Sequence, residues 1–391
     1  MMRRIGAMNF INEFSYASLV LALPLYLISR GMEVEEIGLV LSLLPFAFIL
    51  VRVSSALIAD VFGVKAFFIA NGLFNAVTAG IYAFAATPLQ FGMGKLSQGA
   101  ASAFFWTVDR TAIMARAHKR SYLMLMSGVR EFGAGLGIIC AGALIAFFSF
   151  ESLFGLLAVL GVVSAAVALS IVNRGATLKK PEWKSVFRIN GREFDFWQVS
   201  AATVFVGASF KLLFVFLLPL LMSAWFGMGY LEVAVMLAAF YLCMGAGGFL
   251  SVRIGEGKLS LLVQLAAIPF IIFLPFDGGF FSIALMATGL GFGVCFGINE
   301  ALFGYLSKKE EGMSSKFAVL LAPVNFTEFL VLALSGFALN ALGIEALFLL
   351  SALLLLASIV LSKKIIGDFE GTKKLISYRP HKGPAAVAAR R

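Results

Sequence analysis

The amino-acid sequence predicts an all-α integral membrane protein with twelve transmembrane helices, arranged as two six-helix pseudo-repeats. The first observation behind this prediction is composition: 61% of the 391 residues are hydrophobic and only 13% are charged, whereas soluble domains are about 25% charged. The second is a recurrence of apolar runs of about 20 residues, the length that crosses a bilayer. The third is the segregation of basic residues into alternate loops, as the positive-inside rule describes.

The same composition excludes several other classes of protein. A cytosolic enzyme needs a charged surface that this sequence cannot supply, and a disordered chain is not this apolar. The three cysteines, Cys140, Cys243 and Cys295, all fall in apolar runs, so we expect no disulfide scaffold and no zinc site. The net charge of +10 comes from the loops, as shown below, and therefore indicates no nucleic-acid partner.

Each helix is expected where an apolar run lies between polar or turn-forming residues. The ninth and tenth runs are separated only by a short turn at residues 275–279. The first run follows Arg3 and Arg4 but has no small-residue cleavage site, so we expect a retained helix rather than a signal peptide. The expected helices are 7–29, 36–58, 66–87, 89–113, 122–147, 152–173, 197–224, 231–251, 259–275, 279–305, 317–341 and 346–362.

The loop charges predict the orientation of these helices. If the N-terminus is cytoplasmic, the cytoplasmic segments hold 25 of the 31 basic residues, and the outer loops hold only Arg30. The other five lie inside helices. Because cytoplasmic loops carry the excess of Lys and Arg, we expect both termini in the cytoplasm and a location in the plasma membrane.

The middle of the chain predicts the division into domains. The longest polar connector, 174–196, separates an N-terminal half (1–173) from a C-terminal half (197–362), and a basic tail follows (363–391). Two weak internal matches support a duplication. The segment that starts at Gly142 is similar to the one that starts at Gly336, and residues 56–63 correspond in position to 248–255.

A motif follows the second predicted helix, in the segment Ala59-Asp60-Val61-Phe62-Gly63-Val64-Lys65. It is similar to the G-x-L-A-D-R-x-G-R-K signature of the major facilitator superfamily, which the chain resembles over residues 5–362. Asp60, Gly63 and Lys65 match, whereas both arginines of the signature are replaced by valine. The resemblance implies a cytoplasmic gate in which Asp109 and Arg110, at the inner end of helix four, supply part of the missing charge relay. The alternative is a generic polar turn.

Two further segments carry the resemblance. The run Lys95–Ala103 in helix four is similar to the family pattern R-x-x-Q-G-x-G-A-A, with lysine in place of arginine. The resemblance implies that Lys95 and Gln98 face a central cavity; the alternative is that Lys95 reaches the outer interface. The glycine stripe after Arg130 in helix five resembles the antiporter motif but lacks its Gly-Pro step, so it indicates a packing or gating face.

Ten charged residues fall inside the predicted helices, five basic and five acidic. A charge at the bilayer centre costs at least about 2.5–3.5 kcal/mol, so each must form an ion pair, line water or reach the interface. Arg52, Asp109 and Arg110 are expected near the inner interface. The ten are Glu13, Arg52, Lys95, Asp109, Arg110, Arg130, Glu131, Lys211, Glu300 and Glu328.

The resemblance implies that helices one, four, seven and ten line the cavity, with help from five and eleven. A carboxylate in a semi-dry cavity can exchange a proton near neutral pH, so Glu13 and Glu131 are candidates for proton coupling, together with Arg130 and Lys95. The alternative for Glu131 is a fixed ion pair with Arg130 or Lys95. The candidates for the substrate cavity are Gln98, Trp106, Lys211, Asn299, Glu300, Asn325 and Glu328.

The predicted function is secondary active transport by alternating access, driven by protons, with efflux of a lipophilic or amphiphilic compound favoured. Uptake or exchange of a polar metabolite is the alternative within this class. A receptor, scaffold or lipid scramblase on the same fold is an alternative of another class. No catalytic constellation, nucleotide-binding loop or histidine within a predicted helix is present, so we expect no enzyme, cofactor or metal. The expected partners are a small solute, protons and the lipid bilayer, and the chain is expected to be monomeric.

Overall fold

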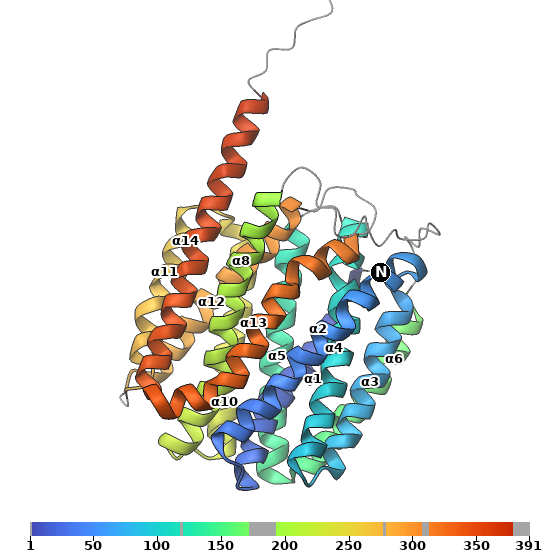
Figure 1. The fold of residues 1–391 in the computed structure, drawn as a ribbon, viewed down its shortest axis with the longest axis vertical. Coiled ribbons are helices and arrows are strands. Elements are labelled where there is room, and N and C mark those ends of the chain that lie inside the picture. The colour runs from blue at the N-terminus through green and yellow to red at the C-terminus, as the bar shows by residue number, and fades with distance from the viewer. Residues whose placement is uncertain (1, 118–119, 172–192, 277–278, 307–312, 378–391) are drawn as a thin grey trace, which may run out of the picture.

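The computed structural model describes residues 2–117, 120–171, 193–276, 279–306 and 313–377. These residues form a bundle of long helices that run up and down between two ends (Figure 1). We call the end at which α1 begins and α14 finishes the upper end, and the end with the turn at Gly31 the lower end. Within this part of the chain, ten helices are long and apolar enough to cross a membrane.

The first six helices alternate in direction. Charged residues inside the apolar stretch of α4 reduce its hydropathy, and this helix is not among the ten candidate spans. The bounds are α1 (Met2–Ser29), α2 (Val34–Phe62), α3 (Lys65–Phe84), α4 (Pro88–Ala117), α5 (Arg120–Phe147) and α6 (Phe150–Leu169).

The second group begins with a continuous helical rod that changes its winding three times. Two stretches are π-helical, η1 and η2. The 18-residue helix α8 precedes them, and the three-residue α-helical stretch α9 separates them. The helix α11 is apolar but shorter than the candidate spans. The bounds are α8 (Glu193–Phe210), η1 (Lys211–Leu217), α9 (Leu218–Leu220), η2 (Leu221–Trp225), α10 (Tyr230–Ile254), α11 (Lys258–Phe273), α12 (Phe281–Leu306), α13 (Met313–Leu342) and α14 (Ile344–Ser377).

Several predicted boundaries differ from the structure. The segment 59–62, expected to be a loop, forms the last turn of α2. The helix α14 continues from its expected end at 362 to Ser377, because its lysines remain compatible with a helix beyond the apolar stretch. The helix α8 begins at Glu193, inside the expected connector, and most of that connector (172–192) lies outside the described residues, as do residues 378–391 of the tail.

Helix packing follows the same pattern in both groups. In the first group, α1 packs on α5 and α6, α3 packs on α4 and α6, and α2 packs on α4. In the second group, α8 packs on α13 and α14, α11 packs on α12 and α14, and α10 packs on α12. Each of these five contacts in one group therefore has a counterpart at the corresponding position of the other.

Two long contacts join the groups, α5 with α10 and α2 with α13. Both depend on glycine, since a small residue lets two helices approach closely. Gly248 of α10 packs against the backbone of Gly128 of α5, and Gly38 of α2 packs against the backbone of Leu332 and Gly336 of α13. A hydrogen bond from Asn340 to Glu35 adds a polar contact between α13 and α2 at the lower end.

A small apolar cluster joins Met124 of α5 to Val294, Ile298 and Ala301 of α12, but the larger apolar core shared between the groups lies towards the lower end. There, one cluster includes Leu19–Leu27 residues of α1 together with Leu212–Met222 residues of the α8–η2 rod. Towards the upper end, one separate cluster lies within α1–α6 and another within α8 and α12–α14. Apolar packing therefore closes the bundle below its centre, and polar groups occupy much of the boundary above it.

Candidate functional site

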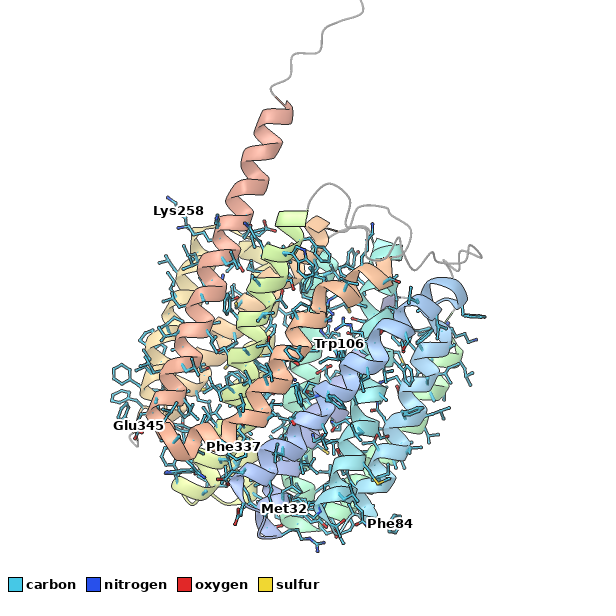
Figure 2. The ribbon with its side chains drawn as sticks, viewed as in Figure 1. Met32, Phe84, Trp106, Lys258, Phe337 and Glu345 are labelled. Carbon is cyan, nitrogen blue, oxygen red and sulfur yellow. The ribbon has the colours of Figure 1, made fainter. Side chains whose placement is uncertain are left out.

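A cavity of about 190 Å³ lies between the two groups of helices, near the middle of the bundle. Both groups contribute to its wall: Glu13 and Tyr16 come from α1, whereas Lys211 and Glu328 come from η1 and α13. Aromatic side chains form much of the remaining lining. Trp106, labelled in Figure 2, is one of them, with Phe48, Phe210, Tyr241 and Phe296.

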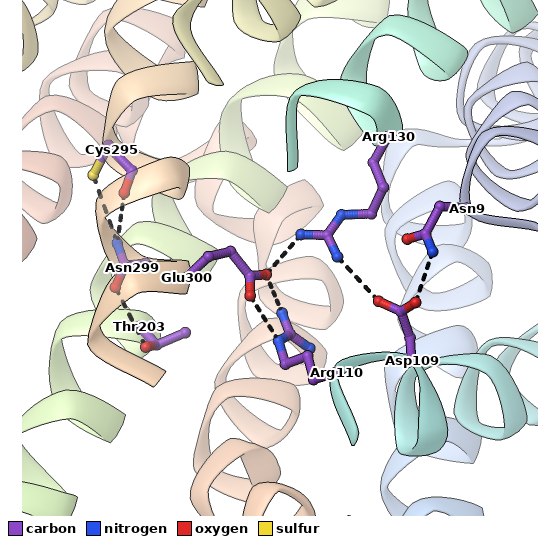
Figure 3. Close-up of polar contacts among 8 residues, drawn as sticks. All are labelled: Asn9, Asp109, Arg110, Arg130, Thr203, Cys295, Asn299 and Glu300. Carbon is purple, nitrogen blue, oxygen red and sulfur yellow. Dashed lines mark hydrogen bonds and ion pairs between the residues drawn. The ribbon is translucent and has the colours of Figure 1, made fainter. Parts of the chain in front are cut away.

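Four charged residues form one network across the two groups, and Arg110, Arg130 and Glu300 of this network belong to the cavity wall (Figure 3). Arg110 of α4 donates to Glu300 of α12 through Nε at 3.0 Å and through Nη2 at 2.5 Å. Arg130 of α5 donates to the same carboxylate through Nη2 at 2.7 Å and to Asp109 Oδ2 through Nη1 at 3.2 Å. Asn9 of α1 completes the network by donating to Asp109 Oδ1 at 2.7 Å.

The network is buried, and the balance of its positive and negative charges explains why its burial is tolerated. Two carboxylates face two guanidinium groups, so no charge of the four is left without an opposite partner, which a buried charge requires. The Trp106 ring lies 5.1 Å from the Arg110 guanidinium carbon and 4.8 Å from that of Arg130, within the range of a cation–π contact. This tryptophan therefore lies beside both arginines of the network and lines the cavity together with them.

A second ion pair lies deeper in the cavity. Lys211 Nζ donates to the Tyr16 hydroxyl at 2.6 Å and lies 3.9 Å from Glu328 Oε2. Lys211 is the first residue of the π-helical stretch η1, and π-turns are frequent at functional sites. The pair connects α1 of the first group with η1 and α13 of the second.

The two predicted proton-coupling acids both line the cavity, and neither belongs to an ion pair within the described residues. Glu13 accepts a hydrogen bond from Asn12 Nδ2 at 3.1 Å, and Asn71 Nδ2 in turn donates to Asn12 Oδ1 at 3.1 Å. Glu131 forms no hydrogen bond to any described residue. The alternative of a fixed pair between Glu131 and Arg130 differs from the structure, since Arg130 binds Asp109 and Glu300 instead.

Lys95 and Gln98 lie outside the cavity wall, in contrast to the expectation from helix four. Lys95 is only 3% exposed, so it does not reach the outer surface either. Its Nζ donates to Gln98 Oε1 at 3.0 Å, and the Tyr82 hydroxyl donates to the same oxygen at 3.1 Å. The tight packing of Gly94 against the Tyr82 ring brings α3 and α4 together at this point.

The remaining predicted residues divide into two sets. Trp106, Lys211, Glu300, Asn325 and Glu328 line the cavity as expected. Asn299 lies behind the wall, where its Nδ2 donates to the Cys295 carbonyl at 3.1 Å and its Oδ1 accepts from Thr203 at 3.4 Å (Figure 3).

The predicted gate segment is described in part. Gly63 has a φ of 83°, a left-handed conformation that favours glycine, and its N–H donates to the Ala59 carbonyl at 2.8 Å. The turn that this glycine permits leads directly into Lys65, the first residue of α3. The side chain of Asp60 lies outside the described part of the structure. Asp109 and Arg110 belong to the buried network rather than to this turn.

Sequence reasoning placed Arg52 at the inner interface, but the structure places it in the cavity wall with 3% of its surface exposed. Its guanidinium carbon lies 5.0 Å from the centre of the Phe48 ring. Nε and Nη2 have no hydrogen-bond partner among the described residues. The signal that could have found it is its position as the only charge within the apolar run 37–58.

Comparisons with known proteins agree with this architecture. A family model described as "Major Facilitator Superfamily" matches residues 5–312. No curated protein matches the chain by sequence. Among solved structures, the chain is similar to a variant of the Escherichia coli fucose:proton symporter FucP, with a TM-score of 0.70 and 15% identity over 93% of this chain and 98% of that one. It is also similar to the human organic anion transporter MFSD10, with a TM-score of 0.71 and 13% identity over 92% of this chain and 99% of that one.

Proposed function

Because the chain belongs to the major facilitator superfamily and is an integral membrane protein, we propose that it is a secondary active transporter that moves a small solute by alternating access, coupled to protons. The observation that carries the proposal is the central cavity. Helices of both groups line it, and two of its carboxylates, Glu13 and Glu131, have no ion-pair partner within the described residues. A carboxylate in such a site can take up and release a proton as its surroundings change.

The proposed architecture is two six-helix halves, α1–α6 and α8–α14, with twelve spans in total. The matching packing of helices in the two groups supports it, because parallel repeats are a transporter design in which one half rocks against the other. The domain boundaries remain 1–173, 174–196, 197–362 and 363–391. The twelve proposed spans are the ten candidate spans together with the short helix α11 and the charge-bearing helix α4.

The proposed orientation places both termini in the cytoplasm, and the membrane is the plasma membrane. The described end charges support this orientation. The upper end carries basic residues, among them Arg253, Lys258 and Lys363, whereas the lower end carries Arg30 and a series of acidic residues. Five of these acids lie in first turns of helices, where the helix dipole stabilises negative charge: Glu35, Glu36, Glu151, Glu232 and Glu345. The proposed carrier works as a monomer.

In this mechanism, the Arg110–Glu300–Arg130 network is the closure between the halves on the cytoplasmic side, and the shared apolar core is the closure on the outer side. Opening the cytoplasmic side would separate Glu300 from Arg110 and Arg130, and opening the outer side would separate the two parts of the shared apolar core. The favoured direction is efflux of an amphiphilic compound, which the aromatic wall and charged groups of the cavity together suit.

The test uses the purified full-length protein in liposomes that contain a pH-sensitive dye. A panel of small amphiphilic acids, amines and neutral compounds is added, and solute-dependent proton movement is recorded. We expect wild-type protein to move protons with at least one compound, and Glu13→Gln or Glu131→Gln to abolish that movement. Glu345→Gln, the same change at an exposed site on α14, serves as the matched control. Unchanged proton movement in both cavity variants contradicts the assignment.

A further inference from the structure

We infer that the cavity binds an organic anion and that Arg52 and Asn325 hold its carboxylate, an inference that rests on the proposed transport function and names its substrate class. Arg52 belongs to α2 and Asn325 to α13, the two helices that form one of the long contacts between the groups. Both side chains line the cavity and both are more than nine-tenths buried.

The first step is that both side chains offer hydrogen-bond donors without an acceptor. Nε and Nη2 of Arg52 and Nδ2 of Asn325 have no partner among the described residues. A buried donor without a partner is costly, and a charged donor costs more than a neutral one. Unpartnered buried donors of this kind are therefore expected in a site where a ligand supplies the acceptor atoms for their hydrogen bonds.

The second step is that the other cations of the cavity are already occupied. Arg110 and Arg130 bind Glu300, and Lys211 binds Tyr16 and lies 3.9 Å from Glu328. Glu328 attracts Arg52 electrostatically, but the two form no ion pair within 4 Å. Within the described lining, Arg52 is thus the cation whose guanidinium remains available to a solute.

The third step concerns the shape of the donors and the wall around them. A guanidinium presents its N–H groups in a planar fork that matches a carboxylate, which a lysine cannot do. The Arg52 guanidinium carbon lies 5.0 Å from the centre of the Phe48 ring, within the range of a cation–π contact. Beyond it, Leu44, Phe210 and Phe296 supply an apolar wall. A volume of about 190 Å³ suits one aromatic ring with a short acidic side chain.

The test compares matched acids and amides. Thermal unfolding of the purified full-length protein is recorded with benzoate and benzamide, 3-phenylpropionate and its amide, and indole-3-acetate and its amide, with inorganic phosphate as a further arm. A ligand that binds the folded state raises the apparent Tm. We expect at least one of the three acids to raise it, and its amide and phosphate to have no effect at the same concentration.

Variants then assign the effect to the two residues. Arg52→Gln is expected to weaken the acid's apparent affinity by about tenfold or more, the size of one lost hydrogen bond to a charged group. Asn325→Ala is expected to weaken it less, and Arg52→Lys to retain part of it. A cooperative unfolding transition of the Arg52→Gln variant without ligand shows that its loss of affinity is not a folding defect. Arg253→Gln, the same change at an exposed site on α10, should leave the affinity unchanged.

Three results overturn the inference: no acid raises the Tm of the wild-type protein, an amide raises it as much as its acid, or Arg52→Gln binds the acid as the wild type does. Flux measurements in liposomes keep this outcome distinct from the proposed function. Flux of an acid that survives Arg52→Gln supports transport and contradicts the anion site. Acid binding that depends on Arg52, without flux of any compound, supports the site and contradicts transport.

Discussion

At the scale of single residues, Glu300 is the residue on which the upper closure depends. One carboxylate accepts from two guanidinium groups that belong to the other group of helices. Removal of one partner from a buried ion pair costs about 3–5 kcal/mol, because the remaining charges lose their compensation. Here the loss of Glu300 would leave two arginines facing the single carboxylate of Asp109.

We therefore expect Glu300→Gln to lower the free energy of unfolding by about 3 kcal/mol, which for a chain of this size lowers the apparent Tm by about 4 °C. Thermal unfolding of the purified protein measures it. Glu345→Gln provides the control, since surface substitutions change stability by less than about 0.5 kcal/mol. Equal destabilisation by both changes would show that the network does not hold the halves together.

Residues of the candidate site were predictable when charge stood out against an apolar background, and less so when geometry decided. Glu13, Lys211 and Glu328 could be selected from the sequence because a charged side chain inside a membrane span is energetically costly and is therefore a candidate for a functional role. The location of Arg52 was missed, because the depth of a long side chain cannot be read from its position on the helix. The turn of α4 that directs Lys95 towards Gln98 and away from the cavity depends on the packing of Tyr82 against Gly94, a contact between helices.

At the scale of the helices, glycine sets how closely the two groups approach. A Cβ on Gly248 would stand 2.9 Å from both Cα and N of Gly128. Backbone atoms of α5 cannot move aside without the whole helix moving. The contact between α5 and α10 is therefore intolerant of any larger side chain at this position.

Gly248→Leu is expected to separate α5 from α10 and to cost at least about 1–3 kcal/mol, the usual range for overpacking. The apparent Tm and solute-dependent proton movement should both fall. Gly155→Leu is the matched control, because Gly155 on α6 has no atom within 4 Å of a built Cβ. If the two variants unfold at the same temperature, the glycine contact does not limit the packing of α5 and α10.

The sequence was sufficient to predict where helices occur, but not their exact ends or their π-helical stretches. Each predicted range overlaps an observed helix, because the alternation of apolar runs and polar breaks reflects the thickness of the bilayer. The π-helical stretches η1 and η2 carry no sequence signal, since hydrophobic runs look alike at any winding. The end of α2 at Phe62 was missed because Ala59 and Asp60 are as compatible with a last helical turn as with a loop.

At the scale of the whole molecule, alternating access requires the lower end to open as well as the upper. The hydrogen bond between Asn340 and Glu35 joins α13 to α2 across the two groups at that end. In a background without the native cysteines, Glu35→Cys with Asn340→Cys places two thiols there for a short reducible crosslinker. We expect crosslinking to abolish solute-dependent proton movement and a reductant to restore it. Undiminished movement in the crosslinked protein would mean that this end does not open.

The ten charges inside the helices have a consequence for the response of the carrier to voltage. Five are basic and five acidic, so the empty carrier has no net charge within the membrane when all ten are ionised. A membrane potential exerts about 2.3 kcal/mol per elementary charge per 100 mV, and basic and acidic charges that move together through it contribute work of opposite sign. A bound monocarboxylate together with one protonated glutamate leaves the sum at zero. One complete cycle then moves no net charge across the membrane, and the proton and solute gradients alone set the direction of transport.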